Sequence, residues 1–330
     1  MTAVAVLGAG AWGTALAIVL ARSGQAVNLA VRRKSQLAAL HNDRENRAYL
    51  SGVPFPPQLH LTEMNADCVR NADAIVMAIP SGFARETLAP VKSAISRESL
   101  VLSVSKGIEQ DSLRTMSQML AELAPPANRI AVLSGPGFAL EIARGKPAAL
   151  VAAAHNDVIS RRAQTLFAAK PLRVYRSLDV IGVELGGASK NVIAIAAGIS
   201  DGLVLGAGAR AALITRGLAE MTRLARAAGA KQETLAGLAG LGDLVLTSTG
   251  DLSRNRRLGL ALGRGEQLSL PAEGAPIAEG VSNARALVRL AERHGVEMPI
   301  SSAVYRVLYE AAPPGAMVDE LLSRELKAEF

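Results

Sequence analysis

The sequence predicts an α/β protein in which a doubly wound parallel sheet is followed by an all-α domain. Two observations predict this class. Short apolar runs alternate with helical patterns up to about residue 180, and only helical patterns remain beyond it. We therefore expect a first domain at residues 1–180 and an all-helical second domain at residues 181–330.

The expected strands are continuous apolar runs, which are typical of strands buried on both faces of a parallel sheet. They cover residues 3–8, 26–33, 73–80, 99–107, 129–136 and 148–154. Helical patterns separate these runs. The first helical pattern ends at Gly24, a suitable C-terminal signal. The helical patterns of this half cover residues 12–24, 35–42 and 111–124.

The chain beyond residue 180 contains helical patterns and no convincing strand run. The patterns cover residues 183–203, 209–229, 253–265, 281–295 and 301–311, with a loop and a short helix expected in residues 311–330. Because several of these helices are apolar, a homodimer that covers them is a hypothesis.

The composition is that of a globular protein. The chain has 330 residues, of which 50% are hydrophobic and 20% charged. Aromatic residues make up only 3%, whereas proteins that bind RNA or single strands usually stack bases on aromatic side chains. The net charge of +7 is spread along the chain, and no zinc-finger, RRM or KH pattern is present. We therefore expect no nucleic-acid partner.

The cysteine count bears on the redox compartment, the spacing of the histidines on metal binding, and the apolar runs on membrane insertion. Cys68 is the single cysteine, which excludes a disulfide within the chain and fits a reducing, cytoplasmic compartment. The four histidines lie far apart, so no metal site is expected. The apolar N-terminus has no basic n-region and is interrupted by glycines. No uncharged apolar run of about 18 residues follows it, so we expect neither a signal peptide nor a membrane span.

A glycine motif, G-x-G-x-x-G, joins the first expected strand to the first expected helix. Gly8 permits a tight turn, Gly10 lets a pyrophosphate approach the backbone, and Gly13 lets helix and strand pack closely. The N-terminus of the helix then provides N–H groups and a positive dipole end for the pyrophosphate. In this strand–turn–helix context the motif predicts a Rossmann-type, dinucleotide-binding domain.

The end of the second strand bears on which dinucleotide is bound. NAD sites usually carry an acidic residue there for the ribose 2′-hydroxyl, but this chain has Arg32, Arg33 and Lys34. Guanidinium groups pair with a 2′-phosphate, so we expect NADP(H) to be preferred, with NAD(H) possible. The alternative is a basic loop that faces solvent.

Two lysines are candidates for the chemistry. Lys106 follows an expected strand at the carboxyl edge of the sheet, where open α/β sheets bind ligands. Lys190 lies in a stretch of Gly, Ala, Val and Ile, where desolvation would lower its pKa toward that of a useful general acid or base. The alternative for Lys190 is a side chain that reaches solvent from a buried helix.

A third group lies in the segment "LGDLVLTSTGDLSRNRRLG". Asp243 stands in a glycine-rich turn, and Ser253 is a suitable N-cap for the helix that follows. Arg254 and Asn255 would then lie in its first turn, where the backbone already favours an anion. Ordinary surface charge is the alternative, and the tasks of Arg256 and Arg257 stay open.

Several long motifs together resemble the bacterial NAD(P)-dependent glycerol-3-phosphate dehydrogenases. They include "GAGAWGTALA", "SKGIE", "SGPGFALEIARG", "VIGVELGGASKNVIAIAAGISDGL", "AGLGDLVLTSTGDLSRNRRLG" and "VEMPI". The resemblance runs from residue 3 to about residue 310. It implies an active site between a Rossmann domain and a helical domain. It also implies interconversion of dihydroxyacetone phosphate and sn-glycerol 3-phosphate for phospholipid synthesis.

The resemblance also implies roles for individual residues, with Lys190 as the proton donor and acceptor. It implies substrate contacts at Lys106, Gly135, Gly137, Lys190, Asp243, Ser253, Arg254 and Asn255. It implies cofactor contacts at Gly8, Gly10, Ala11, Trp12, Gly13, Arg32, Arg33, Tyr49, Lys106, Ala139, Arg254, Ile277 and Glu279. One position departs from the family pattern: Gly137 stands where Thr or Ser is usual, so only its backbone could contact the substrate.

Two other functions fit the same sequence. A related β-hydroxyacid dehydrogenase would share the two-domain plan but take a carboxylate substrate. A non-catalytic NADP(H) sensor would keep the cofactor domain but would not need a lysine in an apolar setting. Lys190 argues against the sensor.

Overall fold

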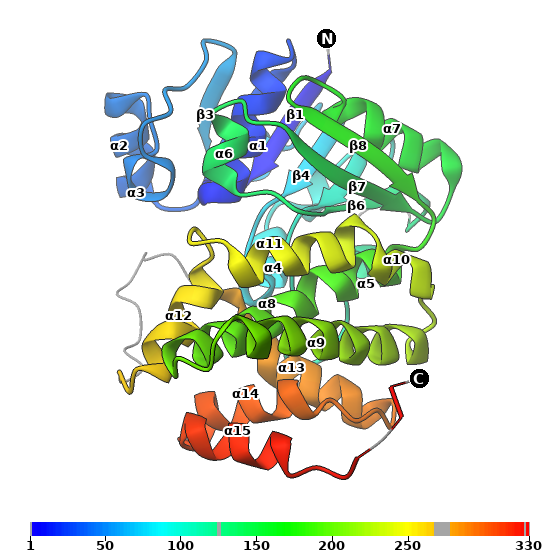
Figure 1. Ribbon diagram of the computed structural model, residues 1–330. Coiled ribbons are helices and arrows are strands. Elements are labelled where there is room, and N and C mark those ends of the chain that lie inside the picture. Colours follow the sequence, from blue (N-terminus) through cyan, green and yellow to red (C-terminus); the bar gives the residue numbers. More distant parts are fainter. Residues whose placement is uncertain (1, 124–126, 267–277, 327, 330) are drawn as a thin grey trace.

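The structure, a computed structural model, describes residues 2–123, 127–266, 278–326 and 328–329. A sheet with its covering helices forms one half of the molecule, and a group of helices forms the other (Figure 1). The last strand ends at Ser177 and the first helix of the second half begins at Val180. The division into domains at residues 1–180 and 181–330 stays a prediction.

Eight strands form one sheet in the order β3-β2-β1-β4-β5-β6-β7-β8. They are β1 (Ala3–Leu7), β2 (Ala26–Val31), β3 (Leu59–Glu63), β4 (Ala74–Met77), β5 (Leu100–Ser103), β6 (Ile130–Ser134), β7 (Ala148–Ala154) and β8 (Leu172–Ser177). All neighbouring strands run parallel except β6 and β7, which run antiparallel. The predicted doubly wound, Rossmann-type sheet is confirmed.

The antiparallel β6–β7 pair corrects the expectation of a wholly parallel sheet. Parallel neighbours need a crossover long enough to carry a helix back along the sheet. The connection between β6 and β7 contains only α6 (Ala139–Ala143), a helix of five residues. The chain therefore turns back and β7 pairs in the opposite direction.

Two strands were absent from the sequence prediction, and both lie at edges of the sheet. β8 begins with alternating buried and exposed side chains and β3 is mostly half-buried or exposed, whereas β4 and β5 are buried throughout. An edge strand with one solvated face lacks the continuous apolar run that marks a central strand. Both strands therefore escaped a search for such runs.

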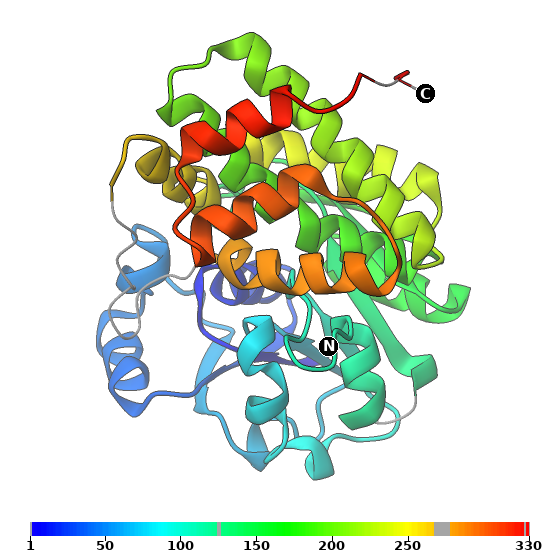
Figure 2. The ribbon, with the colours of Figure 1, turned by 90° about the horizontal axis from the view of Figure 1, so that it is seen from below.

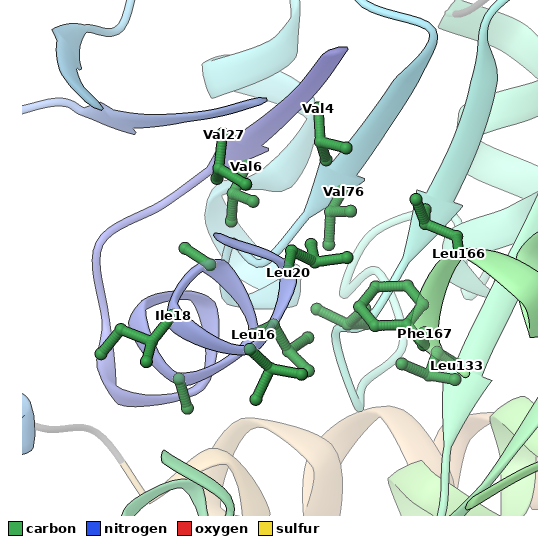
Figure 3. Packing of buried hydrophobic residues seen from close by; sticks show 14 of the residues in the cluster. Val4, Val6, Leu16, Ile18, Leu20, Val27, Val76, Leu133, Leu166 and Phe167 are labelled. Atoms are coloured by element: carbon green, nitrogen blue, oxygen red, sulfur yellow. The ribbon is translucent and has the colours of Figure 1, made fainter. Parts of the chain in front are cut away.

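Helices cover both faces of the sheet. The helices of this half are α1 (Ala11–Arg22), α2 (Lys34–Asp43), α3 (Arg47–Leu50), α4 (Ser81–Leu88), α5 (Met116–Leu123), α6 and α7 (Asp157–Phe167). Val4 and Val6 pack with Leu16 of α1 and Phe167 of α7 (Figure 3), while Leu7 faces the cluster under α4 and α5. Successive side chains of β1 thus enter two different cores, as strand geometry requires.

The helix expected at residues 111–124 begins later, with α5 at Met116. Leu113 has a φ of 59°, in the left-handed region. A right-handed helix cannot continue through that conformation. The segment before Met116 instead bends back, with a β-bridge between Ile108 and Thr115.

The described residues of the second half form helices joined by loops and contain no strand (Figure 2). Its elements are α8 (Val180–Gly202), α9 (Ala207–Ala227), α10 (Gln232–Ala236), the π-helical turn η4 (Leu238–Gly242), α11 (Asp243–Thr249), α12 (Arg254–Gly263), α13 (Glu279–Arg293), α14 (Pro299–Tyr309) and α15 (Pro314–Leu322). The helices expected from the sequence are present. The structure adds α10, η4 and α11, so Asp243 begins a helix rather than standing in a turn.

The central helix of this half is α8. By length and composition it could cross a membrane, and it is the single described helix of which this is true. However, 94% of its most apolar window is buried inside the protein. The apolar character of α8 is therefore that of a core helix.

Glycines bring α8 and α12 into backbone contact. A Cβ on Gly259 would lie 2.0 Å from the carbonyl oxygen of Ile195, and one on Gly198 would lie 2.1 Å from that of Arg256. Gly202 and Gly263 continue the contact one turn further. Because only glycine permits this approach, the spacing fixes where α12 begins relative to Lys190 on α8.

Buried carboxylates attach α8 to its surroundings. Asp179 accepts hydrogen bonds from the backbone N–H of Gly182 at the start of α8 and from that of Lys231 before α10. Glu184 accepts from the backbone N–H and the hydroxyl of Ser117 in α5, at 2.7 and 2.6 Å. Burial raises the pKa of Glu184. The Glu184 contact fixes α8 against the sheet half of the molecule.

Candidate active site

The carboxyl ends of the central strands face the helical half (Figure 1). Lys106 follows β5 and Gly135 follows β6, while α8 and α11 approach from the helical half. Open α/β sheets bind their ligands at this edge. The candidate site therefore combines side chains from both halves of the chain.

A carboxylate between two ammonium groups forms the centre of the site. Lys190 Nζ donates to Asp243 Oδ1 at 2.7 Å, and Lys106 Nζ donates to Asp243 Oδ2 at 2.6 Å. Lys106 Nζ also donates to the carbonyl oxygen of Gly135 at 3.0 Å. Four residues that lie far apart in the sequence are thereby brought together.

The site is almost closed to solvent. The side chains of Asp243 and Lys190 are 1% and 8% exposed. The pKa of Lys190 is lowered to about 8, chiefly by burial; the charge of Asp243 acts to raise this pKa, and the nearby Lys106 acts with burial to lower it. Burial also raises the pKa of Asp243, but the two ammonium groups outweigh it and hold that pKa below its ordinary value. A lysine that exchanges its proton near neutral pH is suited to general acid–base chemistry.

Two further residues of the site were not among those predicted. The Thr247 hydroxyl accepts a hydrogen bond from Lys190 Nζ at 2.7 Å. Asn191 follows Lys190 and its Oδ1 accepts from Asn255 Nδ2 at 2.9 Å. The signal for Thr247 is its spacing of four residues from Asp243, which places both on one face of a helix once α11 is recognised.

The predicted helix start at Ser253 is confirmed. The Ser253 hydroxyl accepts from the backbone N–H of Arg256 at 3.2 Å and caps α12. Asn255 is buried, and its Oδ1 accepts from the backbone N–H of Gly280 at 2.9 Å. The start of α12 therefore lies against α8 and α13, joined to Lys190 through Asn191.

The three arginines of this segment differ. Arg256 pairs with Asp201 at 2.7 Å and with Asp251 at 2.9 Å, so its guanidinium serves the fold. Arg254 is exposed beside the capped start of α12, and its charge acts on Glu279. Arg257 is exposed too. Arg254 is the first residue of α12, so of the three arginines it is the one placed at the helix start, where the backbone favours an anion.

The glycine-rich loop has the shape that a pyrophosphate needs. Gly8 has a φ of +109°, and a Cβ on it would lie 2.6 Å from the carbonyl oxygen of Ala78. A Cβ on Gly13 would lie 2.0 Å from the carbonyl oxygen of Gly8. At Gly10, in contrast, no heavy atom of the described residues outside its own stretch of chain lies within 4 Å of that position. Protein atoms occupy the space beside Gly8 and Gly13, whereas the space beside Gly10 is open. A pyrophosphate can therefore approach the backbone at Gly10, so the loop fits a dinucleotide.

The first turn of α1 also contacts the lysine network. Ala11 and Trp12 begin this helix. The Lys106 ammonium lies 5.6 Å from the centre of the Trp12 ring, a cation–π distance. The nucleotide loop and the lysine pair are therefore neighbours.

The predicted 2′-phosphate residues gather at the end of β2. Arg33 donates to the Tyr49 hydroxyl at 3.1 Å, and the exposed Arg32 lies 5.6 Å from the centre of the Phe83 ring. Both arginine partners are uncharged, so the positive charge at this position is not neutralised by them. The position is separate from the lysine network.

The loop after β6 brings Gly135, Gly137 and Ala139 to the site edge. Gly135 has a φ of +128°, a conformation that favours glycine. A Cβ on Gly137 would lie 2.6 Å from Ile142 Cδ1, so the Ile142 side chain occupies the space of any side chain at that position. Ala139 begins α6.

Glu279 begins α13 near the lysines and Arg254. Burial raises its pKa, and Arg254, Lys106 and Lys190 act to lower it. The predicted cofactor residue Ile277 lies outside the described residues. Within the described part of the chain, no three His, Cys, Asp or Glu side chains are grouped closely enough to hold a metal ion.

Comparison with known families matches almost the whole chain. The N-terminal part of the family described as NAD-dependent glycerol-3-phosphate dehydrogenase matches residues 3–160, and its C-terminal part matches residues 179–319. This chain belongs to that family.

Relatives in the glycerol-3-phosphate dehydrogenase family are similar along their full length. Proteins named glycerol-3-phosphate dehydrogenase [NAD(P)+] from Geobacter sp. strain M21 and Geobacter sulfurreducens are 47% and 48% identical, each over 99% of this chain and 98% of the relative. The crystal structure of glycerol-3-phosphate dehydrogenase from Coxiella burnetii matches with a TM-score of 0.91 at 41% identity. That match covers 98% of this chain and 99% of the other.

Proposed function

We propose that this protein is an NAD(P)-dependent glycerol-3-phosphate dehydrogenase that reduces dihydroxyacetone phosphate to sn-glycerol 3-phosphate. The observation that carries the proposal is the buried group of Lys106, Asp243 and Lys190 at the edge of a dinucleotide-binding sheet. Family membership supports the same activity. The product contains the backbone of glycerophospholipids, so we assign the reaction to their synthesis.

The cofactor is NADP(H) or NAD(H), and it supplies or accepts the hydride when bound. Gly8, Gly10 and Gly13 shape the loop for its pyrophosphate, with Ala11 and Trp12 at the helix N-terminus beside it. NADPH is the preferred form in this proposal, because Arg32 and Arg33 carry charge at the position of the 2′-phosphate.

Lys190 is the proposed proton donor for ketone reduction. Its ammonium stabilises the oxygen that gains charge and then transfers a proton to it. A pKa of about 8 leaves this lysine mostly protonated at neutral pH but close to the value at which it can release the proton. In the reverse direction, neutral Lys190 accepts the proton of the alcohol.

Asp243 and Lys106 prepare this proton transfer. Asp243 holds Lys190 Nζ in place and balances the charge of two ammonium groups that would otherwise repel each other. Lys106 adds a second positive charge beside the reacting oxygen. Its contact with the Gly135 carbonyl fixes that charge at the sheet edge.

The substrate phosphate is proposed to lie at the start of α12. Arg254 and Asn255 lie in the first turn, whose backbone N–H groups and dipole favour an anion. The phosphate is remote from the reacting carbon, so its binding energy serves to align the ketone with Lys190.

The proposed activity is tested by following NADPH oxidation with dihydroxyacetone phosphate, and repeating the assay with NADH and with 3-oxo acids. We expect turnover with dihydroxyacetone phosphate, a higher kcat/KM with NADPH than with NADH, and no turnover of the acids. Turnover of the acids alone would identify a β-hydroxyacid dehydrogenase. Cofactor binding without turnover of any of these substrates would contradict both enzymes.

The role of Lys190 is tested with Lys190→Ala, using Lys92→Ala on the surface as the matched control. General acid–base catalysis contributes about 10²- to 10⁴-fold, so kcat should fall by that order while the Kd for NADPH stays unchanged. Lys92→Ala should behave like the unmodified protein. Near-normal kcat in Lys190→Ala would remove this lysine from its role.

Cofactor preference is tested in the double variant Arg32→Gln, Arg33→Gln. Loss of the two charges should reduce kcat/KM for NADPH and leave that for NADH within about twofold, because NADH has no 2′-phosphate to pair with them. An unchanged ratio of the two efficiencies would mean that these arginines only face solvent.

We also propose a cytoplasmic homodimer. Cys68 is the single cysteine of the chain, which agrees with a reducing compartment. Val204, Leu205 and Leu252 are 86%, 43% and 46% exposed, and apolar side chains of this size are candidates for a subunit contact. Light scattering during size-exclusion chromatography tests the dimer, and a mass of 34.3 kDa would contradict it.

A further inference from the structure

Asn283 of α13 connects the backbones that carry the two lysines. Its side chain is fully buried, and its Nδ2 donates to the carbonyl oxygen of Lys106 at 2.9 Å and to that of Ala188 at 3.2 Å. Lys106 lies after β5 in the sheet half of the chain, whereas Ala188 lies in α8, two residues before Lys190. One amide group thus joins both sides of the candidate site.

The chemistry of the contact suits an amide nitrogen. Both partners are carbonyl oxygens, and the amide of Asn283 presents two N–H donors to them without burying a charge. A carboxylate of the same shape would face the two oxygens with negative charge. A hydroxyl has a single proton and could satisfy only one of them.

The loop after β5 leaves room for the Asn283 side chain at Gly107. A Cβ on Gly107 would lie 2.9 Å from Asn283 Oδ1 and 2.3 Å from the Ser81 hydroxyl. Asn283 Oδ1 has no hydrogen-bond donor among the described residues. An unsatisfied buried acceptor costs stability, and an apolar residue here would avoid that cost but would lose both N–H donors.

We propose that Asn283 is a positioning residue that sets the spacing of Lys106 and Lys190 and so their shared contact with Asp243. It touches neither substrate nor cofactor in this proposal, which rests on the proposed function only for its kinetic test. If the spacing relaxes, Asp243 can hold one ammonium well but not both, and Lys190 loses the carboxylate contact that keeps it protonated.

The charged groups that face Lys190 are Asp243 of α11, Lys106 after β5 and Glu279 of α13. Asp243 and Glu279 favour the protonated lysine, and Lys106 disfavours it. A looser Asp243 contact therefore lowers the pKa of Lys190. Replacement of Asn283 by Asp would add a charge of its own, so neutral variants are required.

The experiment compares Asn283→Ala, which removes both donors, with Asn283→Ser, which keeps one. Gln110→Ala is the matched control, because Gln110 Nε2 also joins the loop after β5 to α13, donating to the Ser282 carbonyl at 2.9 Å, but contacts neither lysine backbone. For each variant we would measure kcat and KM for dihydroxyacetone phosphate, the pH dependence of kcat and the Tm.

We expect Asn283→Ala to lower kcat at least tenfold, with KM for NADPH within twofold, and to move the alkaline limb of kcat to lower pH. Asn283→Ser should fall between Asn283→Ala and the unmodified protein, and Gln110→Ala should change neither kcat nor the limb. Equal kcat losses in Asn283→Ala and Gln110→Ala, or an unmoved alkaline limb, would overturn the proposal. If Asn283→Ala does not fold, the same outcomes apply to folded Asn283→Ser.

A readout without substrate separates this proposal from the proposed function. The titration of Lys190 Nζ can be followed by ¹⁵N NMR in labelled protein, with Lys190→Arg used to assign the signal. We expect a lower pKa in Asn283→Ser than in the unmodified protein, whether or not dihydroxyacetone phosphate is reduced. An unchanged titration would contradict the positioning role even in an active enzyme, and absent turnover with a shifted titration would contradict only the proposed function.

Discussion

The ammonium groups of Lys106 and Lys190 bind opposite oxygens of one carboxylate, that of Asp243, at 2.6 and 2.7 Å. The lysines come from different halves of the chain, and each would repel the other without the carboxylate between them. Asp243 and Lys190 are nearly inaccessible to solvent, so water cannot compensate for the carboxylate charge if Asp243 is replaced. The arrangement predicts how the protein responds to substitution and to pH.

Asp243→Asn should destabilise the protein as well as inactivate it. The change removes the carboxylate that both ammonium groups contact, the buried one of Lys190 and the half-buried one of Lys106, and removal of one partner from a buried ion pair costs about 3 to 5 kcal/mol. Urea unfolding followed by circular dichroism measures the loss. A stability within about 1 kcal/mol of the unmodified protein would mean that one of the lysines is neutral in the folded state.

The pH dependence of the two reaction directions should be opposite. Reduction needs protonated Lys190, so its kcat should fall as pH rises through about 8, the pKa of that lysine. Oxidation of sn-glycerol 3-phosphate needs the neutral form, so its kcat should rise over the same range. Initial rates in both directions between pH 6 and about 10 test this. Parallel profiles in the two directions would exclude Lys190 as the titrating group.

Gly10→Ala and Gly13→Ala should separate cofactor binding from folding. The Cβ at Gly10 enters open space with the backbone in an extended conformation, so Tm should hold while the Kd for NADPH rises. The Cβ at Gly13 meets the Gly8 carbonyl at 2.0 Å, so the Tm of that variant should fall. Fluorescence titration and thermal unfolding distinguish the two. Unimpaired NADPH binding by Gly10→Ala would argue that the pyrophosphate lies elsewhere.

Arg254→Ala and Arg256→Ala should separate substrate binding from folding. Loss of a charged hydrogen bond to phosphate is worth about 1.5 to 3 kcal/mol, so KM for dihydroxyacetone phosphate should rise about ten- to hundredfold in Arg254→Ala. Arg256 is held by Asp201 and Asp251, so its variant should lose Tm and keep KM. The reverse pattern would transfer the anchoring role to Arg256.

Gly259→Ala tests the contact between α8 and α12. The added Cβ would lie 2.0 Å from the Ile195 carbonyl, and overpacking of this kind costs about 1 to 3 kcal/mol. Gly208→Ala in α9 is the control, since nothing lies within 4 Å of its Cβ position and alanine favours the helix. The urea midpoint of unfolding should fall in Gly259→Ala and should stay the same or rise in Gly208→Ala. Equal midpoints would mean that the two helices can separate without cost.

Much of the fold could be predicted because it rests on local patterns. The buried strands β1, β4 and β5 are continuous apolar runs, and the long helices have their own composition and end signals. The edge strands β3 and β8 and the antiparallel direction of β7 could not be predicted in this way. Their pairing depends on which neighbour each strand meets and on the length of the connection, and neither is encoded locally.

The candidate site shows the same division between sequence and tertiary structure. By itself the sequence determined the glycine loop, the Ser253 cap and the apolar setting of Lys190, because each depends on neighbours a few residues away. Only the tertiary structure decided that Asp243 joins two lysines, that Arg256 serves the fold, and that Asn283 connects the lysine backbones. Apart from the Arg256–Asp251 pair, those contacts span 53 to 177 residues, a separation at which chain packing, and no local preference, decides which side chains meet.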